Sequence, residues 1–553
     1  MRSLAVRQRV TRAAAVGASM LLLAAACGKP AAPGGTSEEP GGTEVGGLTV
    51  SLTAGALLVS DGTDQVRIGD QTVKFPTTVT DAAWSPDGSQ IAFVDADGNI
   101  SASRVDGSGR RVLTKAASGV VRSRPSWSRD LIFFAEKRPD GTSALVAVPG
   151  NGCPGAGQPA DAKDWDMDTG DGTSYVDLSP SASLGKGPSR VAFQHNEPGG
   201  PEVWFNDTHQ RQPDTYKVVP GSEPALLPDG SKLAFVGTNG QVYVRTGTTS
   251  PVQITFGADK PHRLAWSADG KQVAYATGTG TAGVIEAVGI SPGANSNPAT
   301  KLSDKPGVPA FLAPQRDVVS RVNGADPIAL AIAASQVRWP AVSNYFPSQD
   351  ANPAYIVSVT TPDAVTADSA QQIHGPTLLT AGNALDQRTA AELQRLFGKV
   401  SNTGKPLVVI TSDQVSASVE NALKGLGYDT KRAPADQHPN APAGEGVCAP
   451  QGARSLFSQT VVVVDPASKV DYAIASHLAN DVGAPILRVD GKSGLTPAQR
   501  DYLARSSAGL DTVLIVDPSG AIPAEVEKKI GELVGGPLGY ATSTNPTVPA
   551  LAR

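Results

Sequence analysis

The chain has 553 residues, with 59 glycines, 44 prolines and only 5% aromatic residues, which is enough for two to four domains. This composition disfavours a helical bundle and is typical of a turn-rich protein. The net charge of −5 disfavours sequence-independent binding of nucleic acid, which needs clustered lysines and arginines.

The first 27 residues have the pattern of a secretory signal. The basic head contains Arg2, Arg7, Arg9 and Arg12. An uncharged, largely apolar run at 13–26 follows it, and Cys27 comes directly after this run. The run is too short for a stable transmembrane helix. Small residues followed by a cysteine resemble the bacterial lipoprotein signal, in which the cysteine thiol receives diacylglycerol. The resemblance implies lipidation of Cys27 at the outer face of a membrane, and the alternative is an ordinary secreted protein.

Residues 28–47 are rich in glycine and proline, and Val45 is their only sizeable apolar residue. Such a segment cannot bury a core and is expected to be a flexible tether. The rest of the chain has no apolar stretch of 18 residues, so we expect a soluble body held near a membrane.

Besides Cys27, the chain contains Cys153 and Cys448. Two cysteines in an exported protein are compatible with one disulfide. They fall in different predicted domains, so a bridge would join those domains. The alternative is two unpaired thiols.

Residues 48–318 contain a repeat. The pattern Trp-Ser-Pro-Asp-Gly followed by Ile-Ala-Phe at 84–93 recurs at 226–235 and 266–275, with weaker copies at 127–133, 178–193 and 309–314. We call the position of the tryptophan, or of the residue that replaces it, the anchor position. The anchor positions are residues 84, 127, 178, 226, 266 and 311. Proline, aspartate and glycine together form a tight turn between two short strands.

Four short strands in about 40–50 residues are typical of one β-propeller blade. The pattern resembles TolB-like propellers, and we expect six blades, with five or seven as alternatives. Strands within 48–70 are expected to close the ring against the last blade. The mouth of such a ring is a rigid set of loops suited to holding a peptide or a protein.

Two weaker motifs lie within the propeller. Residues 278–283 match Gly-x-Gly-x-x-Gly but precede a strand instead of a helix, so we expect a hairpin loop. Alternating carboxylates at Asp164, Asp166 and Asp168 are candidate calcium ligands, although no glutamate closes the loop. The alternative is a solvated acidic loop. We expect no cofactor.

After residue 318, apolar strands alternate with helical stretches, which predicts parallel sheets covered on both faces. The predicted strands are 355–359, 375–380, 406–410, 461–465, 484–489 and 512–516. The predicted helices are 386–397, 415–426, 468–480, 496–506 and 523–533.

This order resembles the type 2 cell-wall-binding repeat of Gram-positive surface proteins. The opening Arg-x-x-Gly-x-Asp of that family matches Arg321, Gly324 and Asp326, and two stretches at 375–380 and 483–488 match its Gly-Ala-Pro-Ile-Leu-Leu strand. We divide the region into repeats at 319–435 and 436–545 and a tail at 546–553. The resemblance implies noncovalent binding of anionic envelope polymers. Acidic residues outnumber basic ones here, and Lys431-Arg432 and Lys528-Lys529 are interpreted as ordinary solvated charges.

A propeller followed by an α/β region is also the layout of prolyl-oligopeptidase-type hydrolases. These enzymes need Gly-x-Ser-x-Gly on a strand-to-helix turn, and no such pentapeptide occurs after residue 319. The sequence therefore predicts a multidomain, all-β plus α/β protein: a six-bladed propeller followed by two three-layer α/β repeats. We interpret it as a noncatalytic, lipid-anchored envelope protein of a Gram-positive bacterium that binds a cell-wall polymer or an envelope protein. The alternatives are a solute- or peptide-capturing receptor lipoprotein and a propeller-associated hydrolase.

Overall fold

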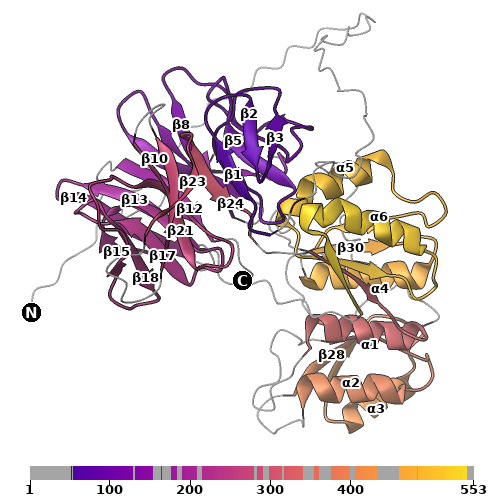
Figure 1. The fold of residues 1–553 in the computed structure, drawn as a ribbon. Helices are drawn as coiled ribbons and strands as arrows, with labels where there is room; N and C mark the ends of the chain where they lie inside the picture. Colours follow the sequence, from indigo (N-terminus) through magenta and orange to yellow (C-terminus); the bar gives the residue numbers. More distant parts are fainter. Residues whose placement is uncertain are drawn as a thin grey trace, which may run out of the picture. The chain divides into compact units, whose positions relative to one another are not determined.

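The computed structural model describes residues 52, 54–128, 131–152, 163–164, 176–183, 190–207, 214–278, 283–290, 298–313, 317–340, 354–359, 375–398, 405–432, 460–482 and 484–544. The strands between residues 57 and 311 form a six-bladed β-propeller, and the elements after residue 316 form two parallel sheets with helices (Figure 1). The predicted fold class and blade count are confirmed.

Each blade is an antiparallel sheet, and in blades 1 to 5 the innermost strand comes first in the chain. Blades 1 to 6, from the innermost strand outward, are β4 (Thr80–Trp84), β5 (Gln90–Val94), β6 (Ile100–Arg104) and β7 (Arg111–Val112); β8 (Val121–Ser128), β9 (Leu131–Lys137), β10 (Ser143–Pro149) and β11 (Lys163–Asp164); β12 (Val176–Ala182), β13 (Arg190–Glu197), β14 (Gly200–Asp207) and β15 (Asp214–Pro220); β16 (Ser222–Leu226), β17 (Lys232–Val236), β18 (Val242–Thr246) and β19 (Val252–Gln253); β20 (His262–Trp266), β21 (Gln272–Thr277), β22 (Val284–Gly289) and β23 (Thr300–Ser303); and β24 (Val308–Phe311), β1 (Leu57–Ser60), β2 (Gln65–Ile68) and β3 (Gln71–Lys74).

The ring is closed by strands from its two ends. β24 is the inner strand of blade 6 and pairs antiparallel with β1, with Ala310 opposite Leu58. This pairing removes the exposed strand edges that an open ring would leave. The predicted closure by residues within 48–70 is confirmed. Residues 279–282 of the predicted hairpin loop lie outside the described residues, and the strands on either side of them, β21 and β22, pair antiparallel with Thr277 opposite Val284.

The repeated turn has a defined hydrogen-bond chemistry. In blade 1, Asp87 Oδ1 accepts bonds from Ser85 Oγ (2.6 Å) and from the backbone N–H of Ser89 (3.2 Å). Gly88 has φ +73°, and a Cβ there would lie 2.5 Å from Leu312 Cδ1. The aspartate and the glycine of the motif are therefore required by the turn itself.

Tryptophan side chains connect neighbouring blades. The indole N–H of Trp84 donates to Ala310 O of blade 6 (3.3 Å), and that of Trp266 donates to Ala225 O of blade 4 (2.9 Å). In each case the tryptophan bonds the inner strand of the preceding blade. These two anchor residues thus connect the inner strands of neighbouring blades, whereas the indole N–H of Trp127 has no hydrogen-bond partner among the described residues.

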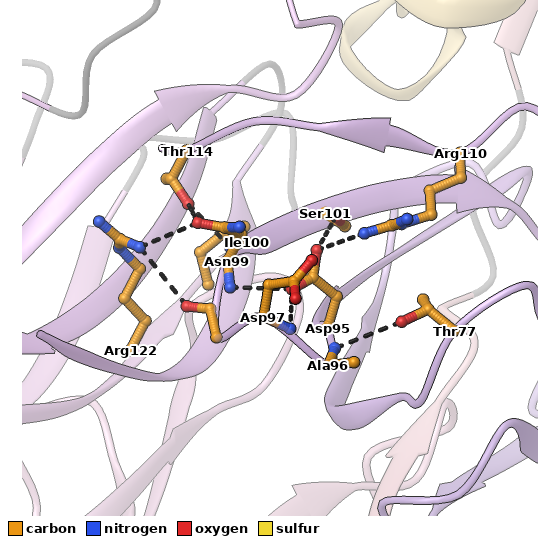
Figure 2. A network of polar contacts seen from close by, with 11 residues as sticks. Thr77, Asp95, Ala96, Asp97, Asn99, Ile100, Ser101, Arg110, Thr114 and Arg122 are labelled. Carbon is orange, nitrogen blue, oxygen red and sulfur yellow. Dashed lines mark hydrogen bonds and ion pairs between the residues drawn. The ribbon is translucent and has the colours of Figure 1, made fainter. Parts of the chain in front are cut away.

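The second turn of blade 1 contains a polar network (Figure 2). Asp95 accepts bonds from the backbone N–H of Asn99 (2.9 Å), from Ser101 Oγ (2.7 Å) and from Arg110 Nη2 (2.6 Å). Burial raises the pKa of Asp95, but these bonds outweigh it and the pKa is lowered. Arg122 of blade 2 donates to Asn99 Oδ1 (3.2 Å), so the network also joins two blades.

The α/β region contains two parallel sheets. The first has the order β27 (Thr377–Thr380), β26 (Ala354–Ser358), β28 (Leu407–Ile410) and β29 (Asp429–Arg432). The second has the order β31 (Ile486–Arg488), β30 (Thr460–Val464), β32 (Thr512–Val516), β25 (Asp317–Val322) and β33 (Tyr540–Thr544). The α-helices are α1 (Pro327–Arg338), α2 (Gln387–Phe397), α3 (Ala417–Gly425), α4 (Lys469–Val482), α5 (Pro497–Ser506) and α6 (Ala524–Val534).

The second sheet is buried on both faces. Val462 and Val464 of β30 belong to a core cluster with α1 and α4, whereas Val461 and Val463 belong to a cluster with α5 and α6. Successive side chains of a strand point to opposite faces, so an unbroken valine run is what a sheet between two helical layers requires.

The two sheets do not follow the predicted repeat boundary at residue 435. β25 comes first in the region, yet it pairs in parallel with β32 and β33 of the second sheet. The chain therefore starts in the second sheet, forms the first sheet, and returns. The boundaries at 318, 435 and 545 stay predictions about sequence repeats. Among the described residues, no helix is long and apolar enough to cross a membrane.

Candidate functional site

Five of the six inner strands carry a β-bulge at the same place. In β4 the register shifts between Thr80 and Ala83, so Asp81 and Ala82 lie opposite Phe93. The other four bulges lie in β8, β12, β16 and β20, opposite Phe134, Phe193, Phe235 and Tyr275. The aromatic residue of the Ile-Ala-Phe pattern is therefore the residue that faces each bulge. Bulges change the direction of a side chain.

The first residue of each bulge has a strained backbone. Among the described residues, the non-glycine residues with positive φ are these five, with φ between 53° and 56°: Asp81, Arg124, Ser179, Glu223 and Arg263. This conformation costs about 1–2 kcal/mol for a residue with a Cβ. Blade 6 has no register shift between β24 and β1, and Val308 takes the corresponding place. Strain repeated at one position around a channel points to a functional constraint on those side chains.

Four of these residues form two ion pairs across the channel, and we call them the channel ring: Asp81, Arg124, Glu223 and Arg263. Arg124 of blade 2 pairs with Glu223 of blade 4, and Arg263 of blade 5 pairs with Asp81 of blade 1. Each guanidinium reaches a carboxylate two blades away, so the contacts span the channel.

Backbone bonds complete the channel ring with an approximate twofold symmetry. Asp81 Oδ2 accepts the backbone N–H of Arg124 (3.0 Å), and Glu223 Oε2 accepts the backbone N–H of Arg263 (2.9 Å). Each acid thus bonds the backbone of the next blade and faces the guanidinium of a more distant one. Blades 1 and 2 correspond to blades 4 and 5.

The two halves of the channel ring differ in the quality of their ion pairs. Arg124 donates two aligned hydrogen bonds to Glu223, of 2.5 and 2.6 Å. Arg263 Nη1 lies 2.7 Å from Asp81 Oδ1, but no N–H is aligned with that oxygen. Asp81 Oδ1 therefore has no hydrogen-bond partner among the described residues, although it is buried. One half is a bidentate pair and the other is a charge contact.

The charge state of Glu223 follows from this geometry. Burial raises the pKa of Glu223, but the charge of Arg124 and the bonds from Arg124 and Arg263 outweigh burial, and the pKa is lowered. The side chain stays a carboxylate at neutral pH, which suits an ion pair and not a general acid.

The channel encloses a cavity of about 180 Å³ lined by the inner strands of all six blades. Arg124, Arg263 and Asp81 line it, whereas Glu223 does not. The side chains of Arg124 and Arg263 are 21% and 27% exposed, and that of Asp81 is 3% exposed. The four charges of the channel ring sum to zero, and the most exposed of the four side chains is that of Arg263.

The site residues predicted from the sequence lie elsewhere. Cys27, Cys153 and Cys448 are outside the described residues, as are Asp166, Asp168 and the side chain of Asp164. Lipidation, a disulfide and calcium binding therefore stay predictions.

The residues of the cell-wall-binding signature have contacts inside the fold. Arg321 pairs with Asp517 (2.9 Å) and Glu527 (2.5 Å), which joins β25 to the loop after β32 and to α6. Asp326 accepts the backbone N–H of Ala329 (2.9 Å) and caps α1. A Cβ at Gly324 would lie 2.2 Å from the backbone N of Leu330. The signature is explained by folding.

The basic pairs also have local partners. Arg432 bonds Glu420 (2.8 Å) and Lys529 bonds Glu532 (3.3 Å). These contacts fit their interpretation as ordinary surface charges.

Sequence reasoning missed the channel ring, although a signal for it exists. Asp81, Arg124, Glu223 and Arg263 each stand three residues before an anchor position, inside a strand expected to be buried. Charges repeated at one phase of a buried strand are unusual. In blade 3 the equivalent anchor is Ala182 and not Leu178, because the bulge lies at Ser179 and Pro180.

Comparisons with known proteins found solved structures with low similarity. No family model matches the chain, and no curated protein matches it. Among solved structures it is similar to TolB from Acinetobacter baumannii, with 17% identity and a TM-score of 0.36 over 47% of this chain and 66% of TolB, just under two thirds. It is also similar to a chain of the mitotic checkpoint complex (14% identity, TM-score 0.29, 50% of this chain and 73% of that one). A third similar structure is the Cps50 (Swd1) β-propeller domain of Myceliophteria thermophila (11% identity, TM-score 0.29, 49% of this chain and 94% of that one).

These similarities concern the fold alone. The propeller fold and its blade count rest on the strand pairing of this chain. The protein is a six-bladed propeller joined to two parallel α/β sheets, and the cavity in the propeller channel is lined by two arginines and an aspartate.

Proposed function

We propose that this protein is a noncatalytic binding protein of the cell envelope, whose propeller channel receives a segment of a partner protein. The observation that carries the proposal is the repeated strain: five blades hold a polar or charged residue at positive φ where the chain lines one cavity. Glycine would adopt this backbone without strain. Keeping long charged side chains there makes sense if their placement at the channel matters.

The chemistry of the cavity supports binding over catalysis. The acids of the channel ring face arginines, and the lowered pKa of Glu223 keeps that group ionised. A general acid or base working near neutral pH needs a pKa close to 7. Paired charges and proline-containing backbone are suited to recognition.

The envelope location is supported by the leader sequence. Cys27 follows a basic head and an apolar run, and a glycine- and proline-rich tether follows it. Labelling cells with a fatty acid should mark the wild-type protein and not the Cys27→Ala variant. Equal labelling of both would remove the anchor from the proposal.

Binding of a wall polymer has less support than binding of a protein. The residues that carry the cell-wall-binding resemblance, Arg321, Gly324 and Asp326, are used in ion pairs, a helix cap and close packing. A polymer would have to bind through other residues of the α/β region.

The proposal can be tested by photo-crosslinking in living cells. A photoreactive amino acid at Leu264, which lines the cavity, should crosslink the full-length chain to a protein of the envelope. The same residue at Val252, 50% exposed on the outer strand of blade 4, is the matched control. Equal crosslinking from both positions, or none from position 264, would contradict channel binding.

A further inference from the structure

The two arginines of the channel ring differ in the hydrogen-bond donors they have left. Arg124 uses both terminal nitrogens on Glu223. Arg263 has one carboxylate within 4.0 Å among the described residues, Asp81, and makes no aligned bond to it. A guanidinium has five N–H donors arranged in a planar fork. Arg263 is therefore the ring residue whose donor set is incomplete.

The incomplete arginine is also accessible. Its side chain is 27% exposed, more than that of any other member of the channel ring, and it lines the cavity. The carboxylate of Asp81 lies on one side of the guanidinium and is almost fully covered. Both residues line the cavity, and the guanidinium of Arg263 is the more exposed of the two groups.

We infer that Arg263 binds a carboxylate carried by the partner protein, an aspartate or glutamate side chain or a chain end, and shares its guanidinium between that group and Asp81. This inference rests on the proposed function of the channel. A guanidinium is well suited to two carboxylates because its fork offers bidentate bonding on more than one edge. In this half of the ring the arginine is 27% exposed and the acid only 3% exposed, so an anion can approach the guanidinium without displacement of Asp81.

The size of the cavity favours a single side chain over a polymer unit. Its volume is about 180 Å³, below the ~300–1,000 Å³ of sites that bury small molecules. The walls are narrow because the inner strands of six blades meet there, with Pro125, Pro180 and Pro224 at the second position of three bulges. An extended peptide that inserts one acidic residue fits this space.

The inference is tested with two blocked tripeptides, acetyl-Gly-Glu-Gly-amide and acetyl-Gly-Gln-Gly-amide, titrated into the full-length chain. Tryptophan fluorescence is the readout, because Trp84, Trp127 and Trp266 line the cavity. The glutamate peptide should bind about tenfold more tightly than the glutamine peptide. Inorganic phosphate, the charged group of many envelope polymers, should compete only weakly.

Three variants assign the effect to the residue. Arg263→Gln should remove the preference for glutamate, and Asp81→Asn should increase the affinity for the glutamate peptide several-fold, because a negative charge beside Arg263 is removed. Arg138→Gln is the matched control, since Arg138 is 34% exposed in blade 2 and does not line the cavity. It should change nothing. Thermal unfolding of each variant checks that it folds.

Some outcomes overturn the carboxylate and leave channel binding intact. Equal affinity for both peptides, an unchanged preference in Arg263→Gln, or phosphate competing as strongly as the glutamate peptide would each do so. If neither peptide binds, the photo-crosslink from position 264 decides. A crosslink yield that Arg263→Gln leaves unchanged overturns the inference, and a complete lack of crosslinking overturns the proposed function.

Discussion

The two halves of the channel ring use the same residue types at the same strand position, yet they differ in structure. In blades 2 and 4, Arg124 and Glu223 form a bidentate pair. In blades 1 and 5, Arg263 and Asp81 form a contact of 2.7 Å without an aligned hydrogen bond. Aspartate is one methylene shorter than glutamate, and we attribute the difference to that methylene.

Opposite charges at symmetric positions of the channel ring do not ensure equivalent contacts. Bidentate bonding needs both carboxylate oxygens to face the guanidinium fork. Asp81 Oδ2 accepts the backbone N–H of Arg124. Asp81 Oδ1 lies near Arg263, but the angle allows no hydrogen bond between them. The first half is expected to contribute mainly to stability, and the second mainly to binding.

The largest expected effect is on stability. Arg124→Gln should lower the free energy of unfolding by about 3 kcal/mol, because it leaves the mostly buried carboxylate of Glu223 without its cation. Arg263→Gln should lower it less, by about 1 kcal/mol, because it removes no aligned hydrogen bond, whereas Arg124→Gln removes two, although Asp81 is the more buried acid. Denaturant unfolding of the full-length chain measures both. Equal losses for the two variants would show that the halves are energetically alike.

The pH dependence of stability should distinguish the half formed by Arg124 and Glu223. The pKa of Glu223 in the folded protein is lowered from 4.5, so its contribution is present above about pH 4.5 and is lost as the pH falls through the folded pKa. The stability advantage of wild type over Glu223→Gln should therefore shrink below pH 4.5. An advantage that stayed constant from pH 7 to pH 3 would mean that the ionised carboxylate adds nothing.

A shorter acid at position 223 should make the pair with Arg124 resemble the contact between Arg263 and Asp81. Glu223→Asp should weaken one of the two bonds to Arg124 and lower the free energy of unfolding by about 1–2 kcal/mol. Glu223→Gln, which keeps the side-chain length, serves as the control for charge. If Glu223→Asp were as stable as wild type, side-chain length would not explain the difference between the halves.

Most of the fold was predictable from the sequence because it depends on local patterns. The Pro-Asp-Gly turns and the aromatic strands predict six blades. The valine run at 461–464 predicts a strand that is covered by helices on both faces of its sheet. Closure of the propeller by β1 was also predictable, since an open ring would leave unpaired edges.

The candidate site was harder to predict because it depends on contacts between distant blades. Arg124 and Glu223 are 99 residues apart, and nothing local indicates which acid pairs with which arginine. The phase of the third repeat was misread for a related reason: the bulge at Ser179 lacks a charged residue and a nearby tryptophan. β25 was missed as a strand of the second sheet because its neighbours β32 and β33 come about 200 residues later.

In the proposed function, the short side chain of Asp81 leaves Arg263 able to hold a carboxylate from a partner. The most direct test is the affinity of the Asp81→Glu variant for the blocked glutamate tripeptide. The longer acid should pair with Arg263 as Glu223 pairs with Arg124, which should stabilise the protein by about 1 kcal/mol and weaken peptide binding about tenfold. Unchanged peptide affinity in a variant that is more stable would contradict the account.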